Sequence, residues 1–159
     1  MYTLRCLGCG WAGRTKILQY RQCRNCDGVA RPINGGLYPI VKKLSEYGIL
    51  VSNAGTVTEL YDVVGTIEVI AVHVDFRQLY DTDLFKLTRL PKGFKHQTFC
   101  DDFGDERSRI VFTEHFFDSE DTLFTPKQRI RHAVRQLQEW ADRMDENGEV
   151  AIYNLMGLI

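Results

Sequence analysis

Four of the five cysteines stand in two closely spaced pairs near the start of the chain. Cys6 and Cys9 are separated by two residues, and Cys23 and Cys26 repeat that spacing further along the chain. A two-residue spacer lets a tight turn direct both thiolates at one metal ion, and two such pairs complete a tetrahedral site. A redox-active Cys-x-x-Cys is less favoured, because two pairs are present and neither begins a helix. The spacing therefore predicts a metal site with four thiolate ligands.

The first 30 residues resemble the zinc ribbon superfamily. The resemblance rests on the two cysteine pairs, on the glycines beside each pair, and on a basic segment with aromatic residues between them. It implies a structural Zn²⁺ ion, closed off by Cys6, Cys9, Cys23 and Cys26 and without a catalytic role. Iron bound as in rubredoxin uses the same ligands and remains the alternative metal.

The segment between the cysteine pairs is a candidate nucleic-acid surface. Residues 11–22 are expected to form a short β-hairpin, with a bend at Gly13 and a strand at 17–20. Five side chains in and beside it combine positive charge with an aromatic ring: Arg14, Lys16, Tyr20, Arg21 and Arg24. Cations neutralise phosphates and aromatic rings stack on unpaired bases, so this composition predicts contacts to nucleic acid. The alternative is that Trp11 and Tyr20 pack this small unit against the rest of the protein, because so short a segment has almost no core of its own.

Charge is distributed unevenly along the chain. Residues 1–36 carry six basic side chains and one acidic one, a balance of +5, whereas residues 37–159 have a balance of −6. A basic head on an acidic body is expected either to engage different partners, nucleic acid for the head and a protein for the body, or to dock head onto body.

The remaining sequence predicts an α+β body. We expect a zinc ribbon at 1–30, a linker at 31–36 and an α+β domain at 37–159, in which a mixed sheet and about three helices form a sandwich. The strand at 66–76 is rich in β-branched residues and apolar on both faces, which is typical of a central strand covered on two sides. The other expected elements are a helix from residue 38, strands at 49–51, 95–100 and 109–117, and helices at 78–89 and from 126.

The last helix has the clearest boundary signals. Thr125 is the predicted N-cap, Pro126 occupies the first helical position, and Gln128 completes a capping-box pattern. An apolar stripe repeats at three- and four-residue steps, as expected for a helix with one buried face. Its members are Ile130, Ala133, Val134, Leu137, Ala141 and Met144. Residues 147–148, Asn-Gly, are expected to end the helix.

Two further groups of residues have a functional and an ordinary interpretation. Cys100 is expected to be a half-buried strand cysteine and not a nucleophile, because nothing in the sequence supplies a neighbouring base. Lys127, Arg129 and Arg131 crowd the start of the last helix, where the helix dipole disfavours cations. They form either a second anion-binding surface, together with His132 and Arg135, or, as we favour, ion pairs with the acidic residues just before the helix. These are Asp118, Glu120 and Asp121.

Evidence for catalysis is weak. His73 and Asp75 share a face of the 66–76 strand, and Glu114 and His115 lie on the predicted hairpin, so a general acid–base pair or a second metal site could be built from them. The histidines are otherwise scattered, and no phosphate loop, nucleophile elbow or zinc-hydrolase motif is present. A small enzyme is therefore the third hypothesis, and it requires a deep polar pocket lined by both His73 and Glu114.

Composition narrows the class of protein. The content of 44% hydrophobic and 26% charged residues is ordinary for a folded protein, and no apolar run is long enough to span a bilayer. The first residues lack the apolar region of a secretory signal, so we expect a cytoplasmic protein that does not contact membranes. The leading hypothesis is a zinc-binding, non-enzymatic, nucleic-acid-associated or regulatory protein. The alternative is a protein-binding adaptor or inhibitor whose zinc ribbon is only a structural staple.

Overall fold

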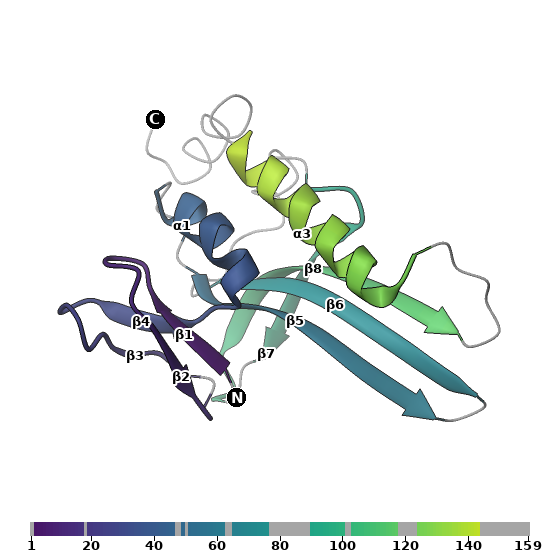
Figure 1. Ribbon diagram of the computed structural model, residues 1–159, viewed down its shortest axis with the longest axis horizontal. Helices are drawn as coiled ribbons and strands as arrows, with labels where there is room; N and C mark the ends of the chain where they lie inside the picture. The colour runs from purple at the N-terminus through teal and green to yellow at the C-terminus, as the bar shows by residue number, and fades with distance from the viewer. Residues whose placement is uncertain are drawn as a thin grey trace.

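The computed structural model describes residues 2–17, 19–46, 49, 51–62, 65–76, 90–100, 103–117 and 124–143. These residues form two four-stranded sheets and two α-helices (Figure 1). The N-terminal sheet has the order β2-β1-β4-β3, and each neighbouring pair is antiparallel. Its strands are β1 (Tyr2–Cys6), β2 (Ala12–Thr15), β3 (Arg21–Gln22) and β4 (Val29–Pro32).

The hairpin predicted between the cysteine pairs is wrong. β2 pairs with β1 and β3 pairs with β4, so these two strands lie at opposite edges of the N-terminal sheet, and residues 17, 19 and 20 are not in a strand. The chain reverses instead at the cysteines: Cys6 N–H donates to the Trp11 carbonyl, and Cys23 N–H donates to the Gly28 carbonyl. The turns that gather the sulfurs are therefore also the hairpin turns, which leaves the segment between them to cross from one edge to the other.

Residues 31–36, expected to be a linker, have regular structure. Arg31 and Pro32 belong to β4, and Ile33 is buried and forms a parallel bridge with Ala54. Asn34 N–H donates to the Ala54 carbonyl, and the Asn34 side chain caps the 3₁₀ helix η1 (Gly35–Leu37). Backbone pairing with the second sheet thus orders the stretch that was predicted to be a linker.

The second sheet, called the body sheet, is antiparallel and not mixed as predicted. Its order is β5-β6-β8-β7, and its three strand pairs are all antiparallel. Two hairpin-connected pairs lie side by side, and hairpins join strands of opposite direction. The strands are β5 (Val51–Asp62), β6 (Thr66–Phe76), β7 (Phe94–Cys100) and β8 (Glu106–Phe117). Strand β5 is far longer than the strand predicted at 49–51, and the 66–76 strand is confirmed.

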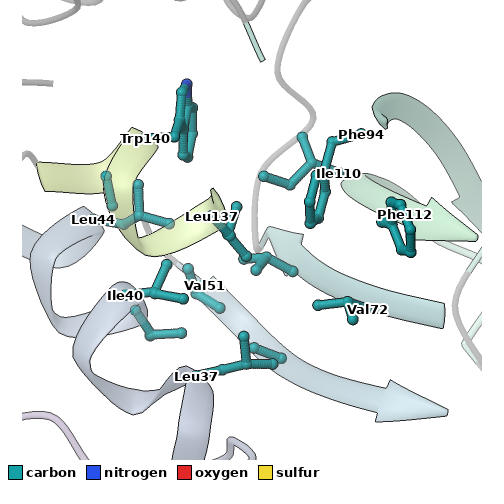
Figure 2. Close-up of a cluster of buried hydrophobic side chains, with 14 of the residues drawn as sticks. Leu37, Ile40, Leu44, Val51, Val72, Phe94, Ile110, Phe112, Leu137 and Trp140 are labelled. Atoms are coloured by element: carbon teal, nitrogen blue, oxygen red, sulfur yellow. The ribbon is translucent and has the colours of Figure 1, made fainter. Parts of the chain in front are cut away.

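The two α-helices, α1 (Tyr38–Glu46) and α3 (Pro126–Asp142), pack on one face of the body sheet (Figure 1). Alternate residues of β6 follow this arrangement, since Ile70, Val72 and Val74 are buried whereas Val69 and Ala71 on the opposite face are only half-buried. The helices therefore cover one side of β6, and the predicted cover on both sides is wrong. The core beneath them is drawn in Figure 2, where its labelled members are Leu37, Ile40, Leu44, Val51, Val72, Phe94, Ile110, Phe112, Leu137 and Trp140.

Helix α3 begins as predicted. Thr125 accepts from the Gln128 backbone N–H at 3.2 Å, and the Gln128 side chain accepts from the Thr125 N–H at 2.8 Å, which completes the capping box. Ala133, Leu137 and Ala141 are buried along its inner face. The described residues contain two α-helices where about three were predicted. The predicted helix at 78–89 and the Asn-Gly helix end lie outside the described residues.

Candidate metal centre and neighbouring clefts

The four paired cysteines meet at one point of the N-terminal sheet. Their Sγ atoms all lie within 4.8 Å of one another, with 3.7 Å between Cys6 and Cys26 and 3.6 Å between Cys9 and Cys23. A tetrahedral ion with metal–sulfur bonds of about 2.3 Å separates its sulfurs by roughly 3.8 Å. All four thiols are free, and a disulfide would bring two sulfurs to about 2 Å. The cluster therefore fits one metal ion and is compatible with Zn²⁺.

The second cysteine turn is shaped around its sulfurs. The N–H groups of Asn25 and Gly28 donate to the Sγ atoms of Cys23 and Cys26, respectively, each at 3.3 Å. A Cβ atom at Gly28 would lie 3.2 Å from Cys26 Sγ and 3.3 Å from Cys6 Sγ, so glycine leaves the sulfurs room to converge. Backbone dipoles of this kind stabilise thiolate charge and orient the ligands.

The thiols differ in how readily they ionise. A hydrogen bond from the Asn25 side chain, followed by one from the Trp11 backbone, lowers the pKa of Cys9 to about 6. At Cys26 the Gly28 N–H lowers the pKa, but hydrogen bonding to the neighbouring cysteines opposes it and the pKa is raised to about 12. Several thiolates crowded together repel one another, and a divalent cation at their centre removes that repulsion. The cluster is thus arranged to gain from a bound cation.

The five residues predicted to contact nucleic acid are all exposed, but they do not form one patch. Arg14, Arg21 and Arg24 line a groove of about 140 Å³ together with Trp11, and we call this the arginine groove. Its remaining lining residues are Leu4, Gly13 and Gln22. Lys16 and Tyr20 lie outside that lining.

The two aromatic residues of the segment have different environments. Trp11 packs against the small buried cluster of the N-terminal sheet, and a Cβ at Gly13 would lie 2.3 Å from its ring. Tyr20 is 66% exposed, and the Arg31 guanidinium lies 5.7 Å from the centre of its ring. Trp11 is therefore a packing residue of the N-terminal sheet itself and, contrary to the alternative interpretation, does not join that sheet to the body, whereas the ring of Tyr20 stays open to solvent.

The structure brings His73 and Asp75 into contact, but it does not bring Glu114 to the same cleft. His73 Nδ1 lies 3.0 Å from Asp75 Oδ1 at a cleft of about 580 Å³, which we call the sheet cleft. Glu114 does not line it and accepts from Arg129 Nε at 2.6 Å. The pocket that the enzyme hypothesis required, lined by both His73 and Glu114, is not found among the described residues.

The two remaining groups of candidate residues include Arg129 and Cys100. The Glu114 contact supports the ion-pair interpretation of Arg129, although the partner differs from the acidic residues expected before the helix. Cys100 lies in β7 and is exposed, so the expectation of half-burial is wrong.

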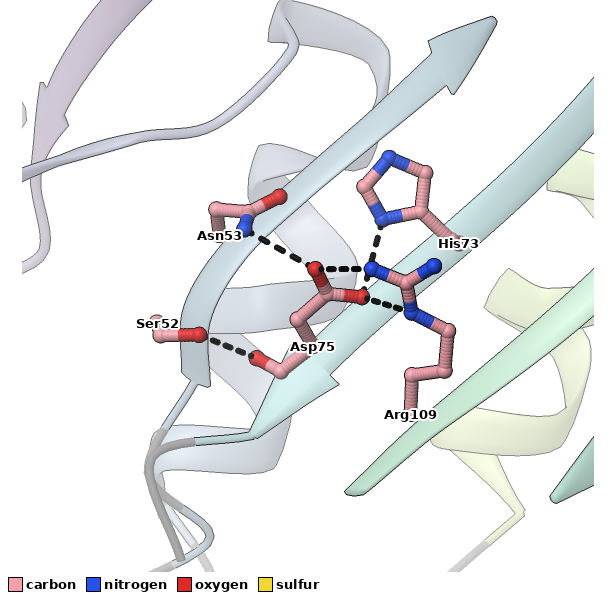
Figure 3. A network of polar contacts seen from close by, with 5 residues as sticks. All are labelled: Ser52, Asn53, His73, Asp75 and Arg109. Atoms are coloured by element: carbon pink, nitrogen blue, oxygen red, sulfur yellow. Dashed lines mark hydrogen bonds and ion pairs between the residues drawn. The ribbon is translucent and has the colours of Figure 1, made fainter. Parts of the chain in front are cut away.

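Sequence reasoning missed two residues of the Asp75 network. Arg109 and Asn53 both bond to the Asp75 carboxylate (Figure 3). Both stand opposite Asp75 in the neighbouring strands, β8 and β5. A charge pair across strands is visible only once the register is known, and sequence alone did not give that register.

Comparisons with known proteins add no assignment: no protein-family model, curated protein or solved structure matches the chain. None of the helices in the described part of the chain has the length and apolar character required to cross a membrane.

Proposed function

We propose that the N-terminal unit is a metal-stabilised module that binds nucleic acid through the arginine groove. The observation that carries this proposal is the convergence of Arg14, Arg21 and Arg24 on one groove from both edges of the N-terminal sheet. Arginine is suited to phosphate because its planar guanidinium donates two parallel hydrogen bonds. In the sequence, 6 of the first 36 residues are basic and one is acidic, so a polyanion is the partner that suits this region best.

Tyr20 supplies a separate stacking platform in the N-terminal unit. Its ring is largely exposed, and Arg31 lies near it, so an unpaired base that stacks on the ring would also meet a cation. The described residues of the N-terminal unit form strands and turns and contain no helix that could enter a major groove. Single-stranded nucleic acid, bound with little sequence preference, is therefore the proposed target.

The metal supports the groove indirectly. Arg24 lies between Cys23 and Cys26, and Arg21 lies in β3, the strand that leads into this turn. A structural Zn²⁺ ion held by the four thiolates would fix this turn against β1, and with it the two arginines. Loss of the ion is expected to weaken nucleic-acid binding without any direct contact between metal and ligand.

The test is fluorescence anisotropy of the metal-loaded full chain with labelled single-stranded and duplex oligonucleotides over a range of salt. We expect tighter binding to the single strand and a steep loss of affinity between about 50 and 200 mM salt, because phosphate contacts release counterions. The double variant R14E/R21E should bind at least tenfold more weakly. K42E/R135E makes the same charge change at two exposed positions on the helices and should bind as the unmodified protein does.

Two results would count against the proposal. One is the absence of binding at low salt, and the other is an equal loss in both double variants, which would show that only total charge matters. A Tyr20→Ala variant separates stacking from charge, since it should weaken single-strand binding several-fold and leave the salt dependence unchanged.

A second candidate function, protein binding by the acidic body, is supported by a different surface. The far end of the body sheet extends beyond the helices (Figure 1) and exposes large apolar side chains, among them Leu60 at 68%. Tyr61 and Phe117, which both stand opposite Ile67, are exposed at the same end. An adaptor in which the metal site is only a staple would lose partner capture in a Leu60→Asp variant and keep it in R14E/R21E.

A further inference from the structure

The sheet cleft lies between the N-terminal sheet and the face of the body sheet that the helices leave open. Tyr2, Thr3 and Pro32 line it from the N-terminal sheet, while β5, β6 and β8 supply most of the rest. Its volume, about 580 Å³, is within the range of sites that hold small ligands. The cleft is thus large enough for a small molecule, and its polar groups decide which one.

A buried carboxylate organises these polar groups. Asp75 is 2% exposed and accepts from Arg109 Nε and Nη2, both at 2.9 Å, in a two-pronged ion pair (Figure 3). Asn53 Nδ2 donates to the same carboxylate at 2.9 Å. The pair of Asp75 with Arg109 is electrically neutral, and the exposed Glu59 is the one other charged side chain among the described residues of the lining, so the cleft offers no free cation to an anionic ligand.

The same carboxylate fixes the tautomer of His73. A carboxylate can only accept hydrogen bonds, so the contact at 3.0 Å requires a proton on His73 Nδ1 and leaves the lone pair of a neutral ring on Nε2. Nε2 makes no hydrogen bond within the described part of the chain and points away from Asp75 (Figure 3). Gly55 is its cross-strand neighbour, and a Cβ there would lie 3.2 Å from Nε2. Glycine therefore keeps this acceptor uncovered.

Arg109 provides a donor beside that acceptor. Two of its nitrogens bind Asp75, and the guanidinium lies 3.8 Å from the centre of the Phe99 ring, which holds its plane. Nη1 is left with two N–H groups. Because His73 and Arg109 both bond to Oδ1 of Asp75, the acceptor and the donor lie on adjacent side chains of one cluster.

We propose that the sheet cleft binds an uncharged heterocycle of nucleobase size through a lactam edge. The ring N–H would donate to His73 Nε2, and the neighbouring carbonyl would accept from Arg109 Nη1. A lactam presents donor and acceptor on the same side and so suits two neighbouring side chains, whereas an open-chain trans amide presents them on opposite sides. The apolar lining would pack against the faces of the ring and includes Ala54, Val57, Ala71 and Val111. This site is distinct from the arginine groove and does not depend on the function proposed for it.

The test is long-range ¹H–¹⁵N NMR of the metal-loaded full chain, which reports the protonation of each imidazole nitrogen. Without ligand, the spectrum should show His73 with Nδ1 protonated and Nε2 bare. Uridine and guanosine should shift the His73 Nε2 resonance in a saturable manner. 3-Methyluridine, in which the N–H is replaced by a methyl group, should bind at least tenfold more weakly. The absence of any shift at His73 with millimolar uridine would overturn the proposal, and equal binding of uridine and 3-methyluridine would do the same.

Substitutions at the cleft provide an independent check. Gly55→Ala places a methyl group against Nε2, so uridine binding should fall at least tenfold. The amide spectrum of the body should be retained, because alanine is compatible with the extended backbone of a strand. Thr58→Ala, in the same strand but not among the residues that line the cleft, should change nothing. R14E/R21E should leave uridine binding intact even where it abolishes oligonucleotide binding, so the two proposals fail separately. Loss of uridine binding in Thr58→Ala, or its retention in Gly55→Ala, would place the ligand elsewhere.

Discussion

The N-terminal sheet and the body sheet are held together by different means. The buried cluster of the first contains Leu4, Ala30 and two of the clustered cysteines, whereas the second rests on a cluster of 19 buried apolar residues that includes residues of both helices. Burial of apolar area accounts for the body, because each large side chain contributes about 1.5–3 kcal/mol. So small a cluster cannot do the same for the N-terminal sheet, and a metal ion held by the four cysteines would supply the missing stability. The two sheets have the same number of strands, but only the body sheet buries enough apolar area to be stable on its own.

Removal of the metal should have the largest effect, and that effect should be confined to the N-terminal sheet. Structural zinc bound by thiolates supplies on the order of 10 kcal/mol or more of folding free energy. The two tryptophans report on the two regions separately, since Trp11 packs in the N-terminal sheet and Trp140 in the body core. A chelator should therefore change Trp11 fluorescence in a Trp140→Phe variant and leave Trp140 unchanged in a Trp11→Phe variant.

Cysteine substitutions sharpen the same comparison. Cys23→Ser should lower zinc affinity at least 100-fold, whereas Cys100→Ser, outside the cluster, should leave it unchanged. Elemental analysis and competition with a chromophoric chelator measure both. Cooperative loss of both tryptophan signals would show that the two sheets fold as one unit.

Acid should also act on the N-terminal sheet first. Only thiolates bind the metal. The pKa of Cys26 is raised to about 12, so this thiol must lose a proton on binding the metal at any ordinary pH. The pKa of Cys9 is lowered to about 6, so this residue is already a thiolate above pH 6. The stability that the metal contributes is therefore greatest at high pH and falls as the pH is lowered. Below about pH 6 protonation of Cys9 adds one more competing proton, so affinity should fall about tenfold faster per pH unit. Zinc titrations between pH 5 and about 8 measure this slope, and a constant slope would contradict the lowered pKa.

A cavity in the body core should produce a smaller loss of stability, and that loss should be confined to the body. Leu137 is fully buried between helix and sheet, and Leu137→Ala should reduce the free energy of unfolding by about 2–5 kcal/mol. Urea unfolding followed by Trp140 measures that loss, while zinc affinity should stay the same. An equal fall in zinc affinity would show that the body supports the metal site.

Loss of the α3 cap should have the smallest effect. Thr125→Ala removes the hydrogen bond to the Gln128 N–H and should cost about 1 kcal/mol, measured by the same urea unfolding. Thr125→Ser retains the hydroxyl and should restore most of the stability. Equal losses in the two variants would assign the effect to packing of the methyl group.

Local chemistry was predictable from the sequence, and pairing between distant segments was not. The cysteine spacing, the β6 strand and the cap at Thr125 follow from rules that act over a few residues, and the structure confirms them. The predicted hairpin between the cysteine pairs failed because the cysteine turns themselves reverse the chain, which spacing alone does not reveal. Arg109 remained hidden for a similar reason, since its partner Asp75 is 34 residues away and meets it only through strand register.

The bridge between Ile33 and Ala54 limits how the molecule can move. Ile33 directly follows the last residue of β4 and is already anchored in the body core, so no free stretch of backbone remains in which a swivel could form. The bond from Asn34 N–H to the Ala54 carbonyl secures the next residue as well. The cysteine turns therefore keep a fixed orientation relative to the face of the body sheet that the helices leave open. A ligand that contacted both regions at once would therefore have to span a fixed distance between them.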